Sequence, residues 1–114
     1  MSVGETHSEL FVDFSGESLQ RRGYRLEGGL APLRETLAAA MLVAAGWPGE
    51  APPVLMDPFC GSGTLLIEAA GMLLQHAPGL LRDEYGLLHW PGTDLALWRQ
   101  LREEARAARR DPPP

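Results

Sequence analysis

Apolar residues follow two different spacings along this chain, and the spacing changes from stretch to stretch. Residues 10–14 are rich in aromatic and apolar side chains and residues 54–56 are wholly apolar, so both predict strands, the second buried in a parallel sheet. Residues 31–45 and 95–108 place apolar side chains three and four positions apart, and residues 64–70 are rich in helix formers. Strands mixed with three helices indicate an α/β fold.

Residues that begin and end helices flank these stretches. Pro32 suits a first helical turn, where its missing N–H costs nothing, and Gly46 suits the C-terminal cap of the same helix. Thr93 or Asp94 can cap the last helix. Residues 75–92 combine Pro-Gly pairs with leucines, so we expect an irregular segment that packs in part.

The central stretch, residues 54–70, predicts a strand, a glycine-rich turn and a helix. Asp57 and Pro58 end the strand. Gly61 and Gly63 let the backbone turn sharply and bring its amides close to a ligand. The first amides of the helix lack internal partners and carry partial positive charge, which favours a carboxylate or phosphate at this turn.

The sequence of this turn excludes two common classes of nucleotide-binding loop. A Walker A loop needs a lysine after its last glycine, and a dinucleotide loop needs a third glycine where Leu66 stands, so neither pattern is met. An acidic residue followed after three positions by G-x-G resembles motif I of S-adenosyl-L-methionine (SAM)-dependent methyltransferases. Asp57 suits the positive groups of that cofactor and the helix amides suit its carboxylate. The alternative is an ordinary strand-turn-helix whose glycines only make the turn.

Composition and charge bound the class of protein. The 114 residues suffice for one small domain, and a net charge of −5 gives no global attraction to nucleic acid. A single cysteine excludes an internal disulfide and a multi-cysteine zinc site, and we expect no metal. No stretch has the length of a membrane span or the pattern of a signal peptide, so the expectation is a cytoplasmic protein without a membrane partner.

A basic cluster, Arg21-Arg22-Gly23-Tyr24-Arg25, precedes the first helix. Three arginines beside a tyrosine suit phosphates and the face of a base. The acidic overall charge favours instead a solvated loop with Tyr24 packed down. In the last helix we expect Arg99 to pair with Glu103, and a solvated basic face formed by Arg102, Arg106, Arg109 and Arg110.

Taken in order, these motifs resemble the large-subunit ribosomal RNA methyltransferase K/L family, in its guanine-N2 methyltransferase half. Related tRNA guanine methyltransferases with an RNA-binding THUMP domain share a weaker version of the pattern. The resemblance covers residues 10–110, with 1–9 as a lead-in and 111–114 as a tail. It rests on residues 14–25, 31–40, 57–70 and 77–80, together with Trp90 and Trp98.

The resemblance implies an α/β fold that is the N-terminal part of a Rossmann-like SAM-dependent methyltransferase domain. Its activity would be methyl transfer to the N2 amine of guanosine in ribosomal RNA. The cofactor-binding residues that it implies are Asp57, Pro58, Phe59, Cys60, Gly61, Ser62, Gly63 and Thr64, flanked by Ala31 and Leu33. It also implies a substrate-side or structural role for Arg21, Arg22 and Arg25.

No catalytic residue is expected in this chain. The family's Asn/Asp-Pro-Pro-Tyr motif is absent, and residues 111–114, Asp-Pro-Pro-Pro, lack its aromatic residue. We therefore expect the chain alone to be inactive and its fold to be marginal, with an unfinished sheet edge near Phe11 and Leu55. Three alternatives stay open: a non-catalytic cofactor-binding module that a partner chain completes, a tRNA guanine methyltransferase relative, and a different α/β enzyme that binds a nucleotide.

Overall fold

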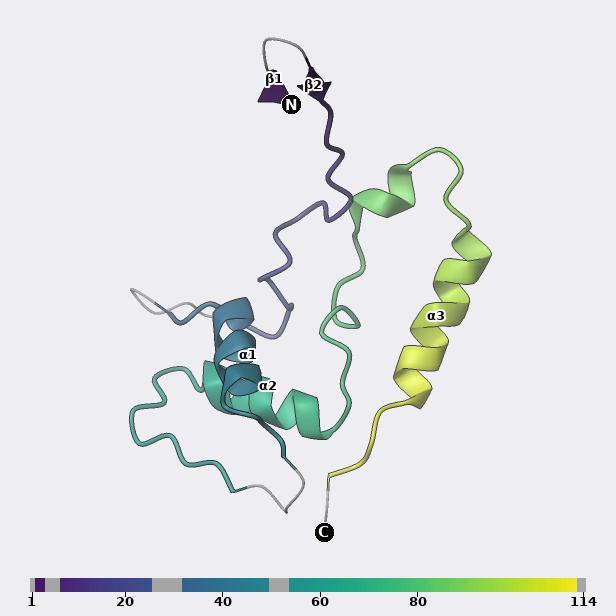
Figure 1. Ribbon diagram of the computed structural model, residues 1–114. Coiled ribbons are helices and arrows are strands. Elements are labelled where there is room, and N and C mark those ends of the chain that lie inside the picture. Colours follow the sequence, from purple (N-terminus) through teal and green to yellow (C-terminus); the bar gives the residue numbers. More distant parts are fainter. Residues whose placement is uncertain (1, 4–6, 26–31, 50–53, 113–114) are drawn as a thin grey trace.

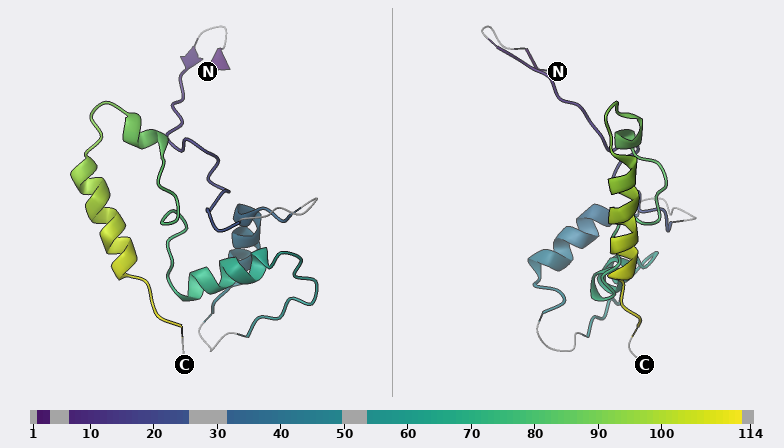
Figure 2. Two further views of the ribbon diagram at one scale, coloured as in Figure 1. Left: turned by 180° about the vertical axis from the view of Figure 1, so that it is seen from behind. Right: turned by 90° about the vertical axis from the view of Figure 1, so that its right-hand side faces the viewer.

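The computed structural model describes residues 2–3, 7–25, 32–49 and 54–112. Its elements in chain order are β1 (Ser2–Val3), β2 (Ser8–Glu9), α1 (Glu35–Ala44), α2 (Thr64–Leu73), the 3₁₀ helix η1 (Gly86–His89) and α3 (Leu95–Ala107). The two short strands form an antiparallel hairpin that stands away from the helices (Figures 1 and 2). Within the described ranges this hairpin is the only sheet.

The three predicted helices are confirmed, and so are two of their caps. α1 begins at Glu35 rather than in the 31–34 segment, of which Ala31 lies outside the described residues. Gly46 follows α1 with a φ of 77°, the left-handed conformation that a glycine C-cap adopts. At α3, Asp94 rather than Thr93 is the cap, because its carboxylate accepts two backbone N–H groups of the first turn.

The two strands predicted from composition are wrong. Residues 10–14 and 54–56 are irregular, and the side chains of Val54 and Met56 are 92% and 83% exposed instead of buried. A strand exists only when its backbone forms a ladder with a neighbouring strand, and no described segment forms such a ladder with either stretch. Around residue 14 the backbone pairs with an irregular segment instead, since the Phe14 carbonyl oxygen accepts the N–H of Leu87 at 3.0 Å.

The interior lies where α1 crosses α2 (Figure 1). Its buried apolar side chains among the described residues are Ala38, Leu42 and Ala69. Trp47, just after α1, ties the two helices together, because its indole Nε1–H donates to the Ala69 carbonyl oxygen at 3.0 Å. An interior this small is held by polar groups as well, and within the described ranges the buried ones are Glu35, Thr64, Glu68 and Arg82.

Arginine side chains fasten the irregular segments to one another. Arg82 donates from Nη2 to the carbonyl oxygens of Ser15 and Glu17, at 3.2 and 2.9 Å. Arg102, on α3, donates to the carbonyl oxygens of Arg82 and Leu80, both at 2.9 Å. The prediction that Arg102 belongs to a solvated face is therefore wrong, since its guanidinium satisfies backbone carbonyls that no regular element pairs.

α3 lies apart from the crossed pair α1 and α2 (Figures 1 and 2). Its Trp98 packs edge-on against Tyr85, with ring centroids 5.1 Å apart. Glu103 forms an ion pair with Arg106, one turn further on, rather than the predicted pair with Arg99. The helix is thus joined to the rest by a few specific contacts, and none of its residues is buried.

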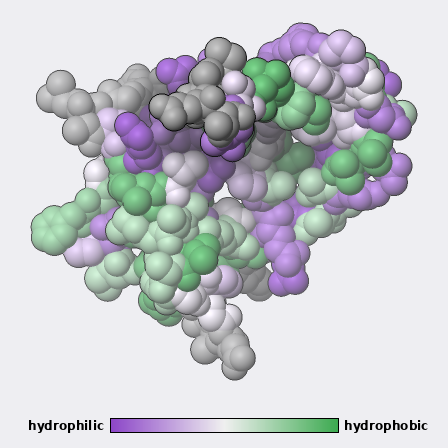
Figure 3. All heavy atoms as spheres, turned by 45° about the horizontal axis from the view of Figure 1, so that its top comes forward, coloured by the Kyte–Doolittle hydropathy of each residue, from purple (hydrophilic) through white to green (hydrophobic). Residues whose placement is uncertain are grey.

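The described chain leaves much apolar surface open. Its Cα radius of gyration is 17.7 Å, whereas a compact domain of this length has about 13 Å. Apolar residues interrupt the polar surface in several places on the face seen in Figure 3. Across the described ranges no helix is both long and apolar enough to cross a membrane.

Candidate functional site

The predicted glycine turn into α2 is present. The Asp57 carboxylate accepts the backbone N–H of Phe59 at 3.1 Å, and the N–H of Gly63 donates to the Cys60 carbonyl oxygen at 2.8 Å. Gly61 and Gly63 have φ values of 53° and 75°, in the left-handed region where a side chain is strained. The prediction that both glycines are there to turn the backbone is confirmed.

The N-terminus of α2, at the end of this turn, has no side-chain cap. Its N-cap is Gly63, which has no side chain to accept a hydrogen bond. The first bond within the helix runs from the Ile67 N–H to the Gly63 carbonyl oxygen at 2.9 Å, so the amides before Ile67 have no partner inside the helix. The preceding loop is open too, with Phe59 92% exposed and Cys60 exposed. The turn therefore offers uncapped N–H donors next to an exposed loop.

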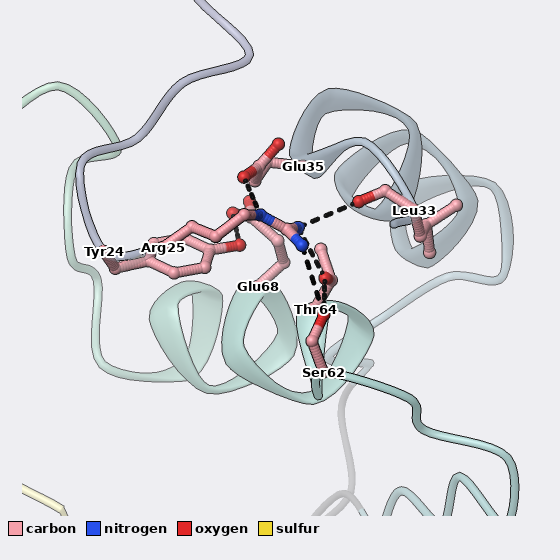
Figure 4. A network of polar contacts seen from close by, with 7 residues as sticks. All are labelled: Tyr24, Arg25, Leu33, Glu35, Ser62, Thr64 and Glu68. Atoms are coloured by element: carbon pink, nitrogen blue, oxygen red, sulfur yellow. Dashed lines mark hydrogen bonds and ion pairs between the residues drawn. The ribbon is translucent and has the colours of Figure 1, made fainter. Parts of the chain in front are cut away.

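The guanidinium of Arg25 joins three segments next to this turn (Figure 4). Its Nε–H donates to Glu35, the first residue of α1, at 3.0 Å. Its Nη2 donates to the Leu33 carbonyl oxygen at 3.0 Å and to the Thr64 hydroxyl at 2.8 Å. Its Nη1 donates to the Ser62 hydroxyl at 3.2 Å. One planar side chain thus connects the start of α1, the glycine turn and the first residue of α2.

Arg22 and Tyr24 converge on a second carboxylate, that of Glu68 in α2. The Tyr24 hydroxyl donates to Glu68 Oε1 at 3.0 Å, and Arg22 Nη2 lies 3.5 Å from Glu68 Oε2. Between them Gly23 has a φ of 95°, and a Cβ there would lie 3.0 Å from the Leu81 carbonyl oxygen. Tyr24 is packed down as predicted, but Arg22 and Arg25 are not solvated.

The remaining site residues divide as follows. Arg21 is exposed and its contact is an ion pair with Glu17 at 3.4 Å, while Leu33 contributes its carbonyl oxygen to Arg25. Glu35 and Glu68 were missed by the sequence reasoning. The signal for Glu68 was present, because a lone carboxylate in an apolar helix is buried only when it is paired.

Within the described ranges no three His, Cys, Asp or Glu side chains gather closely enough to hold a metal ion.

Burial and the hydrogen bond to Glu68 raise the pKa of Tyr24 above its ordinary value of 10.0. A raised pKa means that the contribution of Tyr24 to stability is complete below about pH 10 and is lost as the pH rises through the folded-state pKa. We expect the free energy of unfolding to fall more steeply above about pH 10 in the wild type than in Tyr24→Phe.

Urea titrations at a series of alkaline pH values measure this difference. The two chains differ only at residue 24, so the difference between their profiles reports on Tyr24 alone. Parallel pH profiles for the two chains would contradict the expectation and would mean that Tyr24 ionises as easily folded as unfolded.

Residues 22–112 match the model of the family described as RMKL-like, methyltransferase domain. This match covers most of the chain, which therefore belongs to that family, as the resemblance of its motifs predicted.

Individual relatives agree with the family assignment. The ribosomal RNA large subunit methyltransferase K/L of Desulfotalea psychrophila is 53% identical over 111 residues, 96% of this chain and 15% of that protein. The protein of the same name from Methylococcus capsulatus is 57% identical over 97 residues, 83% of this chain and 13% of that protein. The chain thus spans about one seventh of the length of these curated relatives.

Two solved structures share the fold. SMU.472, classed as a methyltransferase and complexed with SAH, has a TM-score of 0.74 and 41% identity, over 86% of this chain and 24% of that one. A predicted N6-adenine-specific DNA methylase from Listeria monocytogenes has a TM-score of 0.73 and 41% identity, over 85% of this chain and 25% of that one. The fold is therefore that of part of a methyltransferase domain, as predicted.

Proposed function

We propose that residues 57–64 bind the methionine part of SAM, and that this chain belongs to an enzyme that methylates guanosine N2 in large-subunit ribosomal RNA. The observation that carries the proposal is the turn through Gly61 and Gly63 into the uncapped N-terminus of α2. The SAH in the related SMU.472 and the name of the K/L relatives support it.

The residues present fit this cofactor. The uncapped amides of α2 suit a carboxylate, and the carboxylate of Asp57 suits an ammonium or sulfonium group. SAM, when bound, supplies a methyl group activated by its positive sulfur. The residues of this chain bind and orient the amino-acid end, and we place no catalytic residue among them. Guanine N2 is a poor nucleophile, so its positioning accounts for much of the catalysis.

Cys60 provides a direct test, because it is the only cysteine of the chain and is exposed in the proposed loop. We expect SAM, and neither NAD nor ATP, to slow the reaction of Cys60 with a thiol reagent and to give heat in calorimetry. The reaction of the urea-unfolded chain is the control, since no ligand can protect it there. Protection by NAD or ATP without protection by SAM would favour the nucleotide-binding alternative.

The target base needs a separate experiment. We expect no transfer of tritiated methyl from SAM to ribosomal RNA by the 114-residue chain alone, because its loop is open to solvent and Val54 and Met56 before it lie exposed. The exposure of this loop favours the interpretation that additional protein is needed to complete the active site. Incorporated label would refute the expectation, and nucleoside analysis would then distinguish N2-methylguanosine from N6-methyladenosine.

A further inference from the structure

We propose that Arg25 is a positioning residue that holds the cofactor loop in its binding conformation, and that it does not contact RNA. The inference deepens the proposed function and rests on it. It assigns one purpose to four contacts: the side chain keeps the Ser62 and Thr64 hydroxyls and the N-terminus of α2 in place relative to α1 (Figure 4).

The first argument is where the acceptors of Arg25 lie. Two of them, Ser62 and Thr64, stand on either side of Gly63, the left-handed N-cap residue of α2. The other two belong to the start of α1, at Leu33 and Glu35. Glycine makes the turn possible but does not select it, because glycine adopts many conformations at similar cost. The Arg25 guanidinium favours the observed conformation of the turn, because it holds the hydroxyls on both sides of Gly63 in place.

The second argument is a count of hydroxyl protons. A hydroxyl has one proton and two lone pairs, and Arg25 donates to both Ser62 and Thr64, so it occupies a lone pair on each. The two hydroxyl oxygens lie 3.2 Å apart, close enough for one to donate to the other. One proton of the pair is then left as a donor at the mouth of α2. A carboxylate held by the helix amides is a suitable acceptor for it.

The third argument is that Arg25 is already neutralised. Its partner Glu35 is only 7% exposed, and the two side chains meet at 3.0 Å. An RNA phosphate would have to displace a buried carboxylate, which would leave that carboxylate unpaired at high cost. The neutral pair also leaves the positive field of the α2 N-terminus for the cofactor. Arg21, exposed and paired only with exposed Glu17 among its described contacts, is the matched arginine without such a role.

Hydrogen exchange of the ligand-free chain tests the clamp independently of SAM. We expect Arg25→Lys, which keeps the charge but lacks the planar fork, to raise exchange about tenfold at the hydrogen-bonded amides of Phe59 and Gly63 and to leave the α1–α2 core unchanged. Arg21→Ala is expected to change neither region. A uniform rise through the whole chain would overturn the proposal, because that pattern marks a merely structural role, and so would unchanged exchange at the Phe59 and Gly63 amides.

Thr64 provides a second variant should Arg25→Lys fail to fold. Thr64→Val removes the acceptor at nearly constant shape and is expected to weaken SAM binding about tenfold, whereas Thr64→Ser keeps the hydroxyl and should restore it. The double variant Arg25→Lys/Thr64→Val should lose no more affinity for SAM than the more affected single variant, because both substitutions remove the same hydrogen bond between Arg25 and Thr64. Full additivity would overturn the proposal. A wild type that binds no SAM would refute the proposed function and leave the exchange result as the test of the clamp.

Discussion

We expect Glu68→Ala to lower the free energy of unfolding by about 3 kcal/mol, because it leaves the Arg22 guanidinium without its carboxylate in a half-buried position. It also removes the acceptor of the Tyr24 hydroxyl. The side chain borders a cavity of about 140 Å³ between α2 and residues 76–81, so alanine enlarges a space that is already unfilled. Urea unfolding followed by far-UV circular dichroism measures the change.

The matched control is Glu17→Ala, which removes a carboxylate of the same chemistry from the exposed Arg21. Since exposed ion pairs are screened by water, we expect this variant to lose less than about 1 kcal/mol. Equal losses for the two variants would mean that burial of the Glu68 network does not matter to stability. Little loss in either would show that the crossing of α1 and α2 is held by its apolar contacts alone.

The second large effect is expected at Gly63. A valine there must adopt a φ near the observed 75°, which costs a β-branched residue about 2 kcal/mol, or else the turn must open. Opening the turn moves the first amides of α2 away from the loop, so we expect Gly63→Val to lower the affinity for SAM at least about tenfold. Calorimetric titration with SAM measures the affinity, and thermal unfolding measures the strain.

Gly71 offers the control, because it lies inside α2 and an added Cβ meets no atom within 4 Å. We expect Gly71→Ala to stabilise the helix by about 0.5–1 kcal/mol and to leave the affinity for SAM unchanged. If Gly63→Val bound SAM as tightly as Gly71→Ala does, the conformation of the turn would not be what recognises the cofactor.

The ten basic residues of the chain are all arginine, and the structure gives several of them a use that lysine could not supply. Arg25, Arg82 and Arg102 each donate to two or more acceptors distant from them in the sequence or structure, most of them backbone carbonyls outside regular elements. A planar fork of five N–H donors can hold several such groups at once, whereas an ammonium acts as a point charge. In a fold with little apolar interior, the hydrogen bonds of these side chains hold segments together that a larger apolar core would otherwise hold.

Local sequence predicted what depends on local geometry. The positive φ at Gly46, Gly61 and Gly63 and the cap at Asp94 follow from properties of single residues, and the structure confirms them. The family followed from the order of the motifs. The predicted strand at residues 54–56 failed for a different reason, because apolar composition specifies burial but cannot supply the neighbouring strand that pairs the backbone.

The sequence by itself thus determined the three helices, the glycine turn into α2 and the family to which the chain belongs. Only the tertiary structure decided the partners of the basic cluster, dividing Arg22 and Arg25 between Glu68 and Glu35 while Arg21 stays at the surface. The physical reason is distance along the chain. A turn or a helix cap is formed by residues only a few positions apart in the sequence. Arg22 and Glu68 are 46 positions apart and meet only after α1 and α2 have packed.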